Sequence, residues 1–163
     1  MNLVKEFNNI RDIIYELPTN INNKDSSCLG KHKKLKQILE GKGLNARYRI
    51  CSYLWSSMNL PENIVNLVKD DEATHLYLEF LINEKWVILD ATWDCGLRNI
   101  FEVNFWDGKN DTKIAVEPIK IFTSEESNKI INEISEQDVL DDLNKNLDFK
   151  IAFNNWLNKE RIK

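Results

Sequence analysis

The stretch "HLYLEFLINEKWVILDAT", residues 75–92, decides the fold that the sequence predicts. Two runs rich in aromatic and β-branched residues, 75–82 and 85–92, flank the polar pair Asn83-Glu84. Two such runs separated by a short polar turn are typical of a β-hairpin. We therefore expect an antiparallel pair of strands in this part of the chain.

The register of this hairpin determines which side chains share a face. Pairing outward from the turn places Leu81 opposite Trp86 and Tyr77 opposite Asp90. Because side chains alternate along a strand, one face is apolar and predicts core. It collects Leu76, Leu78, Phe80, Ile82, Val87, Leu89 and Ala91. The other face collects His75, Tyr77, Glu79, Leu81, Trp86, Ile88, Asp90 and Thr92.

His75 and Asp90 are diagonal neighbours in this register, about 7–8 Å apart between their backbones and within reach of their side chains. A carboxylate in that position can accept the imidazole N–H, fix the tautomer of the ring and stabilise the imidazolium. Asp94 lies on the other diagonal, but past the expected end of the strand. The pair predicts a base together with the acid that orients it.

A cysteine begins the helix expected from "SSCLGKHKKLKQILEGKG", residues 26–43. One of Asp25, Ser26 and Ser27 serves as N-cap, and glycines 41 and 43 end the helix. Cys28 then lies in the first turn, where free N–H groups and the helix dipole favour a thiolate. Its own N–H could also stabilise an oxyanion. A buried thiol and a zinc ligand are the alternatives, but the cysteine spacings match no structural zinc pattern.

The chain has two histidines, so a nucleophilic cysteine must use one of them as its base. His32 follows Cys28 by one helical turn, on the face of Leu35, and we interpret it as a packing residue. His75 has a candidate carboxylate partner. We therefore predict a catalytic triad of Cys28, His75 and Asp90, with Cys51 and Cys95 as structural or incidental thiols.

Other segments complete an α+β fold. We expect a first amphipathic helix from Leu3 to about Leu17, ending before Pro18. Strands are expected at 46–55 and 113–118, and a short helix at 61–69. Arg47 and Arg49 share a strand face with Cys51, and we expect a solvated face with ion pairs rather than a cleft for a carboxylate-bearing substrate. Glu79 is expected to be a solvated or ion-paired strand residue. Two helices close the chain, one from Thr123 or Ser124 and one from about Ser135.

Composition limits the classes of function. The 163 residues suit a single domain, 1–163, and the net charge of −4 argues against nucleic acid or an anionic membrane as main partner. The N-terminal residues do not resemble a signal peptide, and no stretch is long enough to span a bilayer. Three cysteines without paired spacing fit reduced thiols in a cytoplasm.

The sequence from Asp25 to Asp94 resembles the transglutaminase-like superfamily, which has a papain-like core, and is similar to small single-domain bacterial members. The resemblance rests on Cys28 at a helix start, on Gly-x-x-Ala-Arg at 43–47, and on the run from His75 through Trp86 to Asp90 and Thr92. It implies a cysteine helix packed on an antiparallel sheet, as in a papain-like cysteine proteinase. The core spans about 25–94, and a C-terminal helical extension spans about 123–160.

By this resemblance Cys28 is the nucleophile, His75 the general base and acid, and Asp90 the residue that orients the ring. Papain-like enzymes carry a side-chain amide about six residues before the cysteine, and Asn22 occupies that position as a candidate oxyanion donor. The implied function is acyl transfer on an amide or ester bond through a thioester. It includes peptidase, amidase, deamidase and transglutaminase-type reactions.

Several alternatives stay open at this point. The acceptor of the acyl group is water or an amine, and the alternative to an enzyme is a silent transglutaminase-like domain that acts as a binding or scaffolding module. The chemistry needs no cofactor and no metal, and the chain has no calcium-loop signature. The expected partner is a protein or peptide substrate, with no nucleic acid and no membrane, and the oligomeric state is left open.

Overall fold

The computed structural model describes residues 2–161, which form an α+β fold around one curled antiparallel sheet. The sheet has the strand order β3-β2-β1-β4. Its strands are β1 (Ala46–Leu54), β2 (Glu72–Ile82), β3 (Lys85–Leu89) and β4 (Lys120–Ile121). The α+β class predicted from the sequence is confirmed.

The β2–β3 hairpin has the predicted register. Leu81 pairs with Trp86 and Leu78 with Leu89, so the ladder ends one residue before Asp90. The turn residues Asn83 and Glu84 both have positive φ angles, 48° and 64°. This is the backbone of a type I′ turn, whose twist matches that of the flanking strands.

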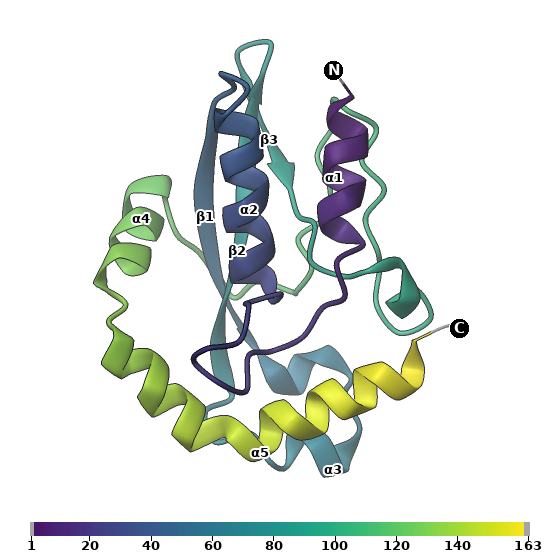
Figure 1. The fold of residues 1–163 in the computed structure, drawn as a ribbon, viewed down its shortest axis with the longest axis vertical. Helices are drawn as coiled ribbons and strands as arrows, with labels where there is room; N and C mark the ends of the chain where they lie inside the picture. The colour runs from purple at the N-terminus through teal and green to yellow at the C-terminus, as the bar shows by residue number, and fades with distance from the viewer. Residues whose placement is uncertain (1, 162–163) are drawn as a thin grey trace.

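Helices α1 (Leu3–Arg11) and α2 (Cys28–Glu40) cover one face of the sheet. In Figure 1 α2 lies in front of β1 and β2, with α1 beside it. The core between these helices and the sheet contains most of the predicted apolar face of the hairpin, while Ile82 is partly buried at its edge and Leu76 lines a cavity. The members of this core are Phe7, Ile10, Leu35, Leu39, Leu78, Phe80, Val87, Leu89, Ala91 and Trp106.

The C-terminal helices α4 (Ser124–Glu133) and α5 (Glu136–Glu160) begin where the sequence predicts, with Thr123 and Ser135 as N-caps of capping boxes. Helix α4 packs beside β1, and α5 runs across one end of the sheet (Figure 1). A second core cluster, rich in aromatic residues, includes side chains of α5. It contains Tyr15, Cys51, Tyr53, Trp55, Ile64, Tyr77, Trp93, Leu97, Val116, Phe149, Phe153 and Leu157.

Three short helices complete the described elements: η1 (Trp55–Met58), α3 (Glu62–Val65) and η2 (Cys95–Leu97). The predicted short helix after Pro61 is therefore confirmed. The predicted strand at 113–118 is wrong, because this segment is irregular and the strand begins at Lys120. The first helix is also shorter than predicted, ending at Arg11 instead of near Leu17.

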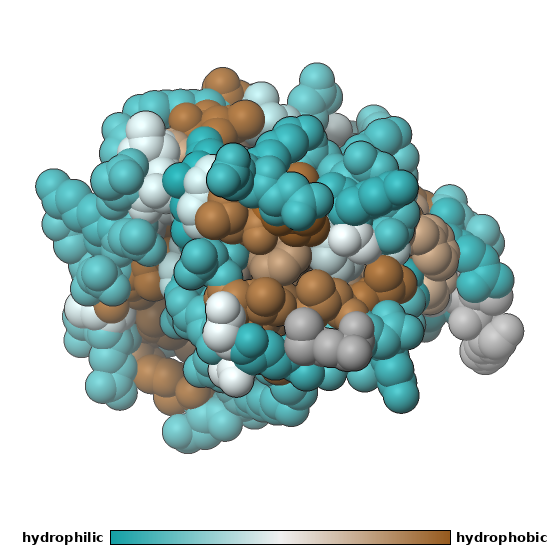
Figure 2. Space-filling view, turned by 90° about the horizontal axis from the view of Figure 1, so that it is seen from above, coloured by the Kyte–Doolittle hydropathy of each residue, from teal (hydrophilic) through white to brown (hydrophobic). Residues whose placement is uncertain are grey.

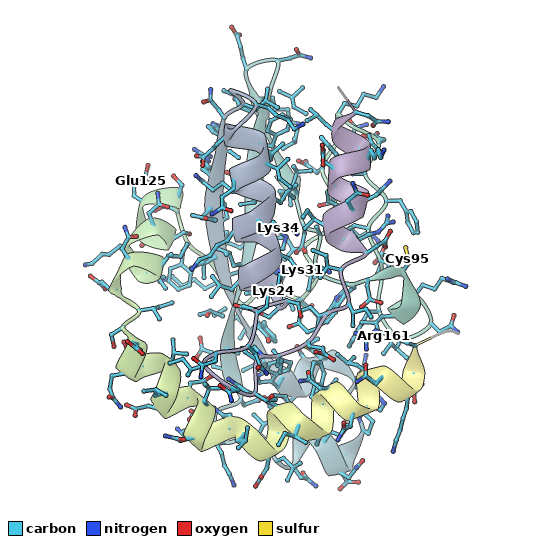
Figure 3. All side chains as sticks on the ribbon, viewed as in Figure 1. Lys24, Lys31, Lys34, Cys95, Glu125 and Arg161 are labelled. Carbon is cyan, nitrogen blue, oxygen red and sulfur yellow. The ribbon has the colours of Figure 1, made fainter. Side chains whose placement is uncertain are left out.

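The segment after α1 is held by a buried ammonium group. Lys31 of α2 is 1% exposed and donates hydrogen bonds to the carbonyl oxygens of Arg11, Ile13 and Thr92, at 2.7, 2.9 and 2.6 Å. Figure 3 shows its side chain pointing from α2 toward α1. Burial lowers the pKa of Lys31 to about 7, while hydrogen bonds to oxygen favour its charged form. One side chain thus joins the N-terminal segment, α2 and the end of the hairpin.

Arg161, at the C-terminal end of the described residues, contacts the same region. Arg161 forms an ion pair with Asp94, 3.0 Å away, and donates to the Tyr15 carbonyl oxygen at 2.6 Å. Figure 3 shows Arg161 close to the η2 segment that carries Cys95. Seen from above, polar side chains cover most of the molecule and apolar ones show between them (Figure 2). Within residues 2–161, no helix combines the length and the apolar character needed to cross a membrane.

Candidate functional site

His75 and Asp90 form a buried hydrogen-bonded pair. The Nε2 atom of His75 lies 2.7 Å from Oδ2 of Asp90, and the two residues are 2% and 0% exposed. The hairpin register produces this contact. His75 lies on β2, and Asp90, the residue that follows β3, is its diagonal neighbour across the hairpin. The structure therefore brings together the two residues that the register places near each other.

His75 and Asp90 each favour the charged form of the other. Burial alone would lower the pKa of His75, but the charge of Asp90 and the hydrogen bond with it raise the pKa to about 10. Burial also opposes ionisation of Asp90, yet the charge and hydrogen bond of His75 hold the pKa of this carboxyl well below its usual range. Near neutral pH the pair is an imidazolium and a carboxylate.

A loop that sequence reasoning did not connect with the site holds Asp90 in place. The backbone N–H of Ala115 donates to Oδ2 of Asp90 at 2.8 Å, and the N–H of Thr92 donates to Oδ1 at 3.1 Å. The Oγ1 atom of Thr112 accepts the N–H of Asp90 at 2.8 Å and donates to the Ile88 carbonyl oxygen at 3.2 Å. Asn104 donates to the Asp90 carbonyl oxygen at 2.9 Å. The segment predicted as a strand at 113–118 thus fixes the carboxylate.

Cys28 is the first residue of α2, as predicted. The N-cap Ser27 makes no capping hydrogen bond to the helix, because its hydroxyl and its N–H both bind Oδ1 of Asp25, at 2.6 and 2.8 Å. Gly30 permits this turn, since a Cβ there would lie 1.9 Å from the Asp25 carbonyl oxygen. The first turn of α2 therefore leaves N–H groups beside a half-buried thiol.

The side chain of Cys28 reaches the same imidazole. The pKa of His75 is raised first by Asp90 and further by the nearby Cys28 side chain. The ring of His75 therefore binds the carboxylate of Asp90 and lies near the side chain of Cys28. Asp94 is not part of this group, because it binds Arg161 and the N–H of Tyr15.

His32 is fully buried between α2 and the hairpin. Its Nδ1 lies 2.7 Å from the carbonyl oxygen of Cys28, and its Nε2 accepts the backbone N–H of Ala91 at 2.9 Å. These contacts require a neutral ring protonated at Nδ1. Burial lowers the pKa of His32 to about 4. The interpretation of His32 as a packing residue is confirmed.

A cavity of about 740 Å³ adjoins Cys28. Its walls come from the start of α2, from β1 and β2, from the segment 15–25, and from α4 and α5. The two C-terminal helices therefore belong to the surroundings of the thiol. Sequence reasoning missed this, because it treated the long C-terminal helix only as a packing element.

Asn22, the candidate oxyanion donor, is exposed in the loop before α2. Its backbone N–H binds Oδ1 of Asn20 at 2.9 Å. Asn20 and Asn23 line the cavity at Cys28, but Asn22 is not among its lining residues. The structure thus brings Cys28, His75 and Asp90 together and leaves Asn22 outside.

The other cysteines have different surroundings. Cys51 pairs with His75 across β1 and β2, and burial raises the pKa of its thiol to about 12. Burial and a hydrogen bond with Asp12 raise the pKa of Cys95. Among residues 2–161, no three His, Cys, Asp or Glu side chains are grouped so that they could hold a metal ion.

The predicted ion-paired face of β1 and β2 is confirmed. Glu79 accepts hydrogen bonds from Arg47 at 2.7 Å and from Arg49 at 2.5 Å. The guanidinium of Arg47 also lies 4.0 Å from the ring centre of Trp86. One carboxylate thus pairs with both guanidinium groups.

Comparison of the chain with protein-family models, with curated proteins and with solved structures found no match. The functional argument therefore rests on the site.

Proposed function

We propose that this protein is a cysteine-dependent acyl-transfer enzyme of the transglutaminase-like type, with Cys28 as nucleophile, His75 as general base and acid, and Asp90 as the residue that orients the ring. The observation that carries the proposal is the buried 2.7 Å hydrogen bond between His75 and Asp90, with the Cys28 side chain near enough to the same ring to raise its pKa. An oriented Cys–His pair of this kind is the usual arrangement for nucleophilic catalysis.

The order of the elements also supports the proposal. A cysteine helix packs on an antiparallel sheet whose neighbouring strands bring histidine and aspartate together, as expected for the papain-like core of this superfamily. The three cysteines are free thiols, which supports a reducing compartment such as the cytoplasm.

The residues suit a two-step reaction. The sulfur of Cys28 attacks the carbonyl carbon of an amide or ester, and the C–S bond forms as charge develops on the oxygen. The free N–H groups at the start of α2 lie beside the sulfur and can bind that oxygen. His75 donates its proton to the leaving amine or alcohol as the scissile bond breaks, which leaves a thioester on Cys28.

The second step regenerates the thiol. His75, now neutral, takes a proton from water or from an amine, which attacks the thioester carbonyl as the C–S bond breaks. Asp90 stays ionised in both steps and stabilises the imidazolium each time it forms. Hydrolysis and transfer to an amine share these residues, and a protein or peptide is the expected substrate.

Thiol reactivity tests the proposal directly. At pH 6, we expect iodoacetamide to label Cys28 at least about 10-fold faster than Cys95, because an imidazolium beside a sulfur favours the reactive thiolate. His75→Ala should remove this advantage, while Cys51 stays unlabelled in the folded protein. Peptide mapping by mass spectrometry gives the rate at each site.

Equal labelling of Cys28 and Cys95, unaffected by His75→Ala, would contradict the proposal. Fast labelling of Cys28 without turnover of any peptide, glutaminyl or ester substrate would instead favour the alternative, a silent domain that binds partners.

A further inference from the structure

The cavity beside Cys28 has the size of a ligand site. Its volume of about 740 Å³ lies within the range of about 300–1,000 Å³ that is typical of small-molecule pockets. Cys28 and Leu29 form part of one wall, so a group bound in the cavity would lie next to the sulfur. The cavity is therefore placed to hold a part of the acyl donor.

The walls of this cavity are mostly apolar. Aliphatic side chains come from α4, α5 and the junction between them, and aromatic side chains come from β1, η1, α5 and the segment before α2. The aliphatic group is Ile130, Ile131, Ile134, Val139 and Leu143, and the aromatic group is Tyr15, Tyr53, Trp55 and Phe149. Two of these residues are exposed: Ile134 is 47% exposed and Val139 is 37% exposed. An apolar ligand would cover this surface.

The charges around the cavity have one predominant sign. The described lining residues include the acids Asp25, Asp70, Glu72, Asp138 and Asp142 and the single ammonium group of Lys150. Lys150 is already paired with Asp142, and Lys145, just outside, is paired with Asp70. A carboxylate or phosphate on the ligand would meet negative charge and no free cation of this lining.

The geometry points to an acyl donor that carries a long uncharged apolar group on the carbonyl that Cys28 attacks, with this group bound between α2 and the C-terminal helices. The inference rests on the proposed function and narrows its substrate class. An aliphatic acyl chain and the side chain of a large apolar amino acid share this chemistry, and anionic acyl groups are disfavoured.

p-Nitrophenyl esters test the inference with the full chain. In each reaction the Cys28 sulfur attacks the ester carbonyl, the C–O bond breaks, p-nitrophenolate leaves, and the acyl group remains on sulfur as a thioester. The rise in p-nitrophenolate absorbance gives the acylation rate, and intact mass confirms one acyl group on the protein. Cys28→Ala gives the background from other groups.

The acylation rate should rise with the length of the chain. We expect octanoate to react at least about 10-fold faster than acetate, because burial of each additional methylene favours the bound state. The monoester of glutaric acid should react more slowly than the neutral butyrate. N-acetyl-leucine and N-acetyl-glycine esters form a second series that separates an apolar side chain from an aliphatic chain.

Two isoleucine variants test the location of the group. Ile134 lines the cavity and Ile151 of α5 does not, although they are 47% and 44% exposed. Ile134→Asp should abolish most of the rate advantage of octanoate over acetate. Ile151→Asp should leave both rates unchanged. Since both sites are exposed, both variants should fold, which circular dichroism can check.

The outcomes separate this inference from the proposed function. A gain with octanoate or with the leucine ester, lost in Ile134→Asp alone, supports the inference and identifies the apolar group. Equal rates for all neutral esters, or a gain that survives Ile134→Asp, overturns the inference but keeps acyl transfer. No acylation of Cys28 by any ester, acetate included, overturns both.

Discussion

His75 and His32 are neighbours in the interior, and they differ in almost every property except burial. Their ring centres lie 6.2 Å apart, and both side chains are almost completely buried. His75 faces a carboxylate and a thiol, whereas His32 faces a backbone carbonyl and a backbone N–H. The pKa of His75 is raised to about 10, and that of His32 is lowered to about 4.

The difference shows that the partners of each ring, and not its burial, determine the direction in which its pKa shifts. Burial acts against the charge of both rings, but only His75 has a buried anion at hydrogen-bond distance to reverse it. A ring with both nitrogens bound to the backbone cannot exchange protons with a substrate. His32 instead connects the peptide of Cys28 to that of Ala91, next to Asp90, and so links the start of α2 to the end of the hairpin.

Replacing His75 should have the largest effect on reactivity. His75→Gln keeps a hydrogen-bond donor for Asp90 but removes the acid and base, so acylation of Cys28 by an ester should fall by about 10³-fold. The burst of p-nitrophenolate measures this rate. Thermal unfolding checks that the variant folds. A loss smaller than about 10-fold would show that His75 is not the base.

Much of this site could be predicted because short-range geometry determines it. A two-residue turn fixes the hairpin register, and the register brings His75 near Asp90. The N-cap residues predict where α2, α4 and α5 begin. These features depend on neighbours in sequence, so the sequence alone contains them.

The remaining features depend on contacts between distant segments. Ile14 and Leu17 continue the helical spacing, yet the chain leaves the helix because the N–H groups of Tyr15 and Leu17 bind Asp94 and Asn154. The segment 113–118 has strand-like residues, but its N–H groups bind the side chains of Asp90 and Asn104. The cavity wall likewise comes from residues more than a hundred positions after Cys28.

The contributions of His75 and His32 to the free energy of unfolding should depend on pH in opposite directions. The pKa of His75 rises on folding from its usual 6.5, so its stabilising contribution is complete below about pH 6.5 and is lost as the pH rises toward 10. The pKa of His32 falls, so its contribution is complete above about pH 6.5 and is lost as the pH falls toward 4.

Chemical denaturation between pH 4 and pH 10 measures these two losses. His75→Gln should flatten the alkaline side of the curve, and His32→Leu should flatten the acid side. The comparison fails if either substitution flattens the opposite side.

Replacing His32 should lower the free energy of unfolding and have only a small effect on the acylation rate of Cys28. His32→Leu fills a similar volume but leaves the buried Ala91 N–H without an acceptor, which costs about 1–3 kcal/mol. The acylation rate should fall by less than about 10-fold, since His75 and Asp90 keep their hydrogen bond. Urea denaturation and the ester burst give the two quantities. A rate loss as large as that of His75→Gln would assign His32 a catalytic role.

The smallest effect is expected at the hairpin turn, far from both rings. Glu84 has a φ of 64°, a conformation that glycine adopts without strain. Glu84→Gly should therefore stabilise the protein by less than about 1 kcal/mol and leave the acylation rate unchanged. Thermal unfolding measures the gain. A changed rate would show that the turn influences the histidines through more than its register.

The number of residues in this turn has a structural consequence that the identity of those residues does not have. Because successive residues of a strand point to opposite sides, one residue inserted between Ile82 and Lys85 would exchange the two sides of β3. Asp90 would then point away from His75, and Ile88 would replace Leu89 in the core. Only insertions or deletions that preserve this alternation keep the acid and the imidazole together. A single-codon insertion at a solvent-exposed loop therefore separates the two side chains without altering either residue.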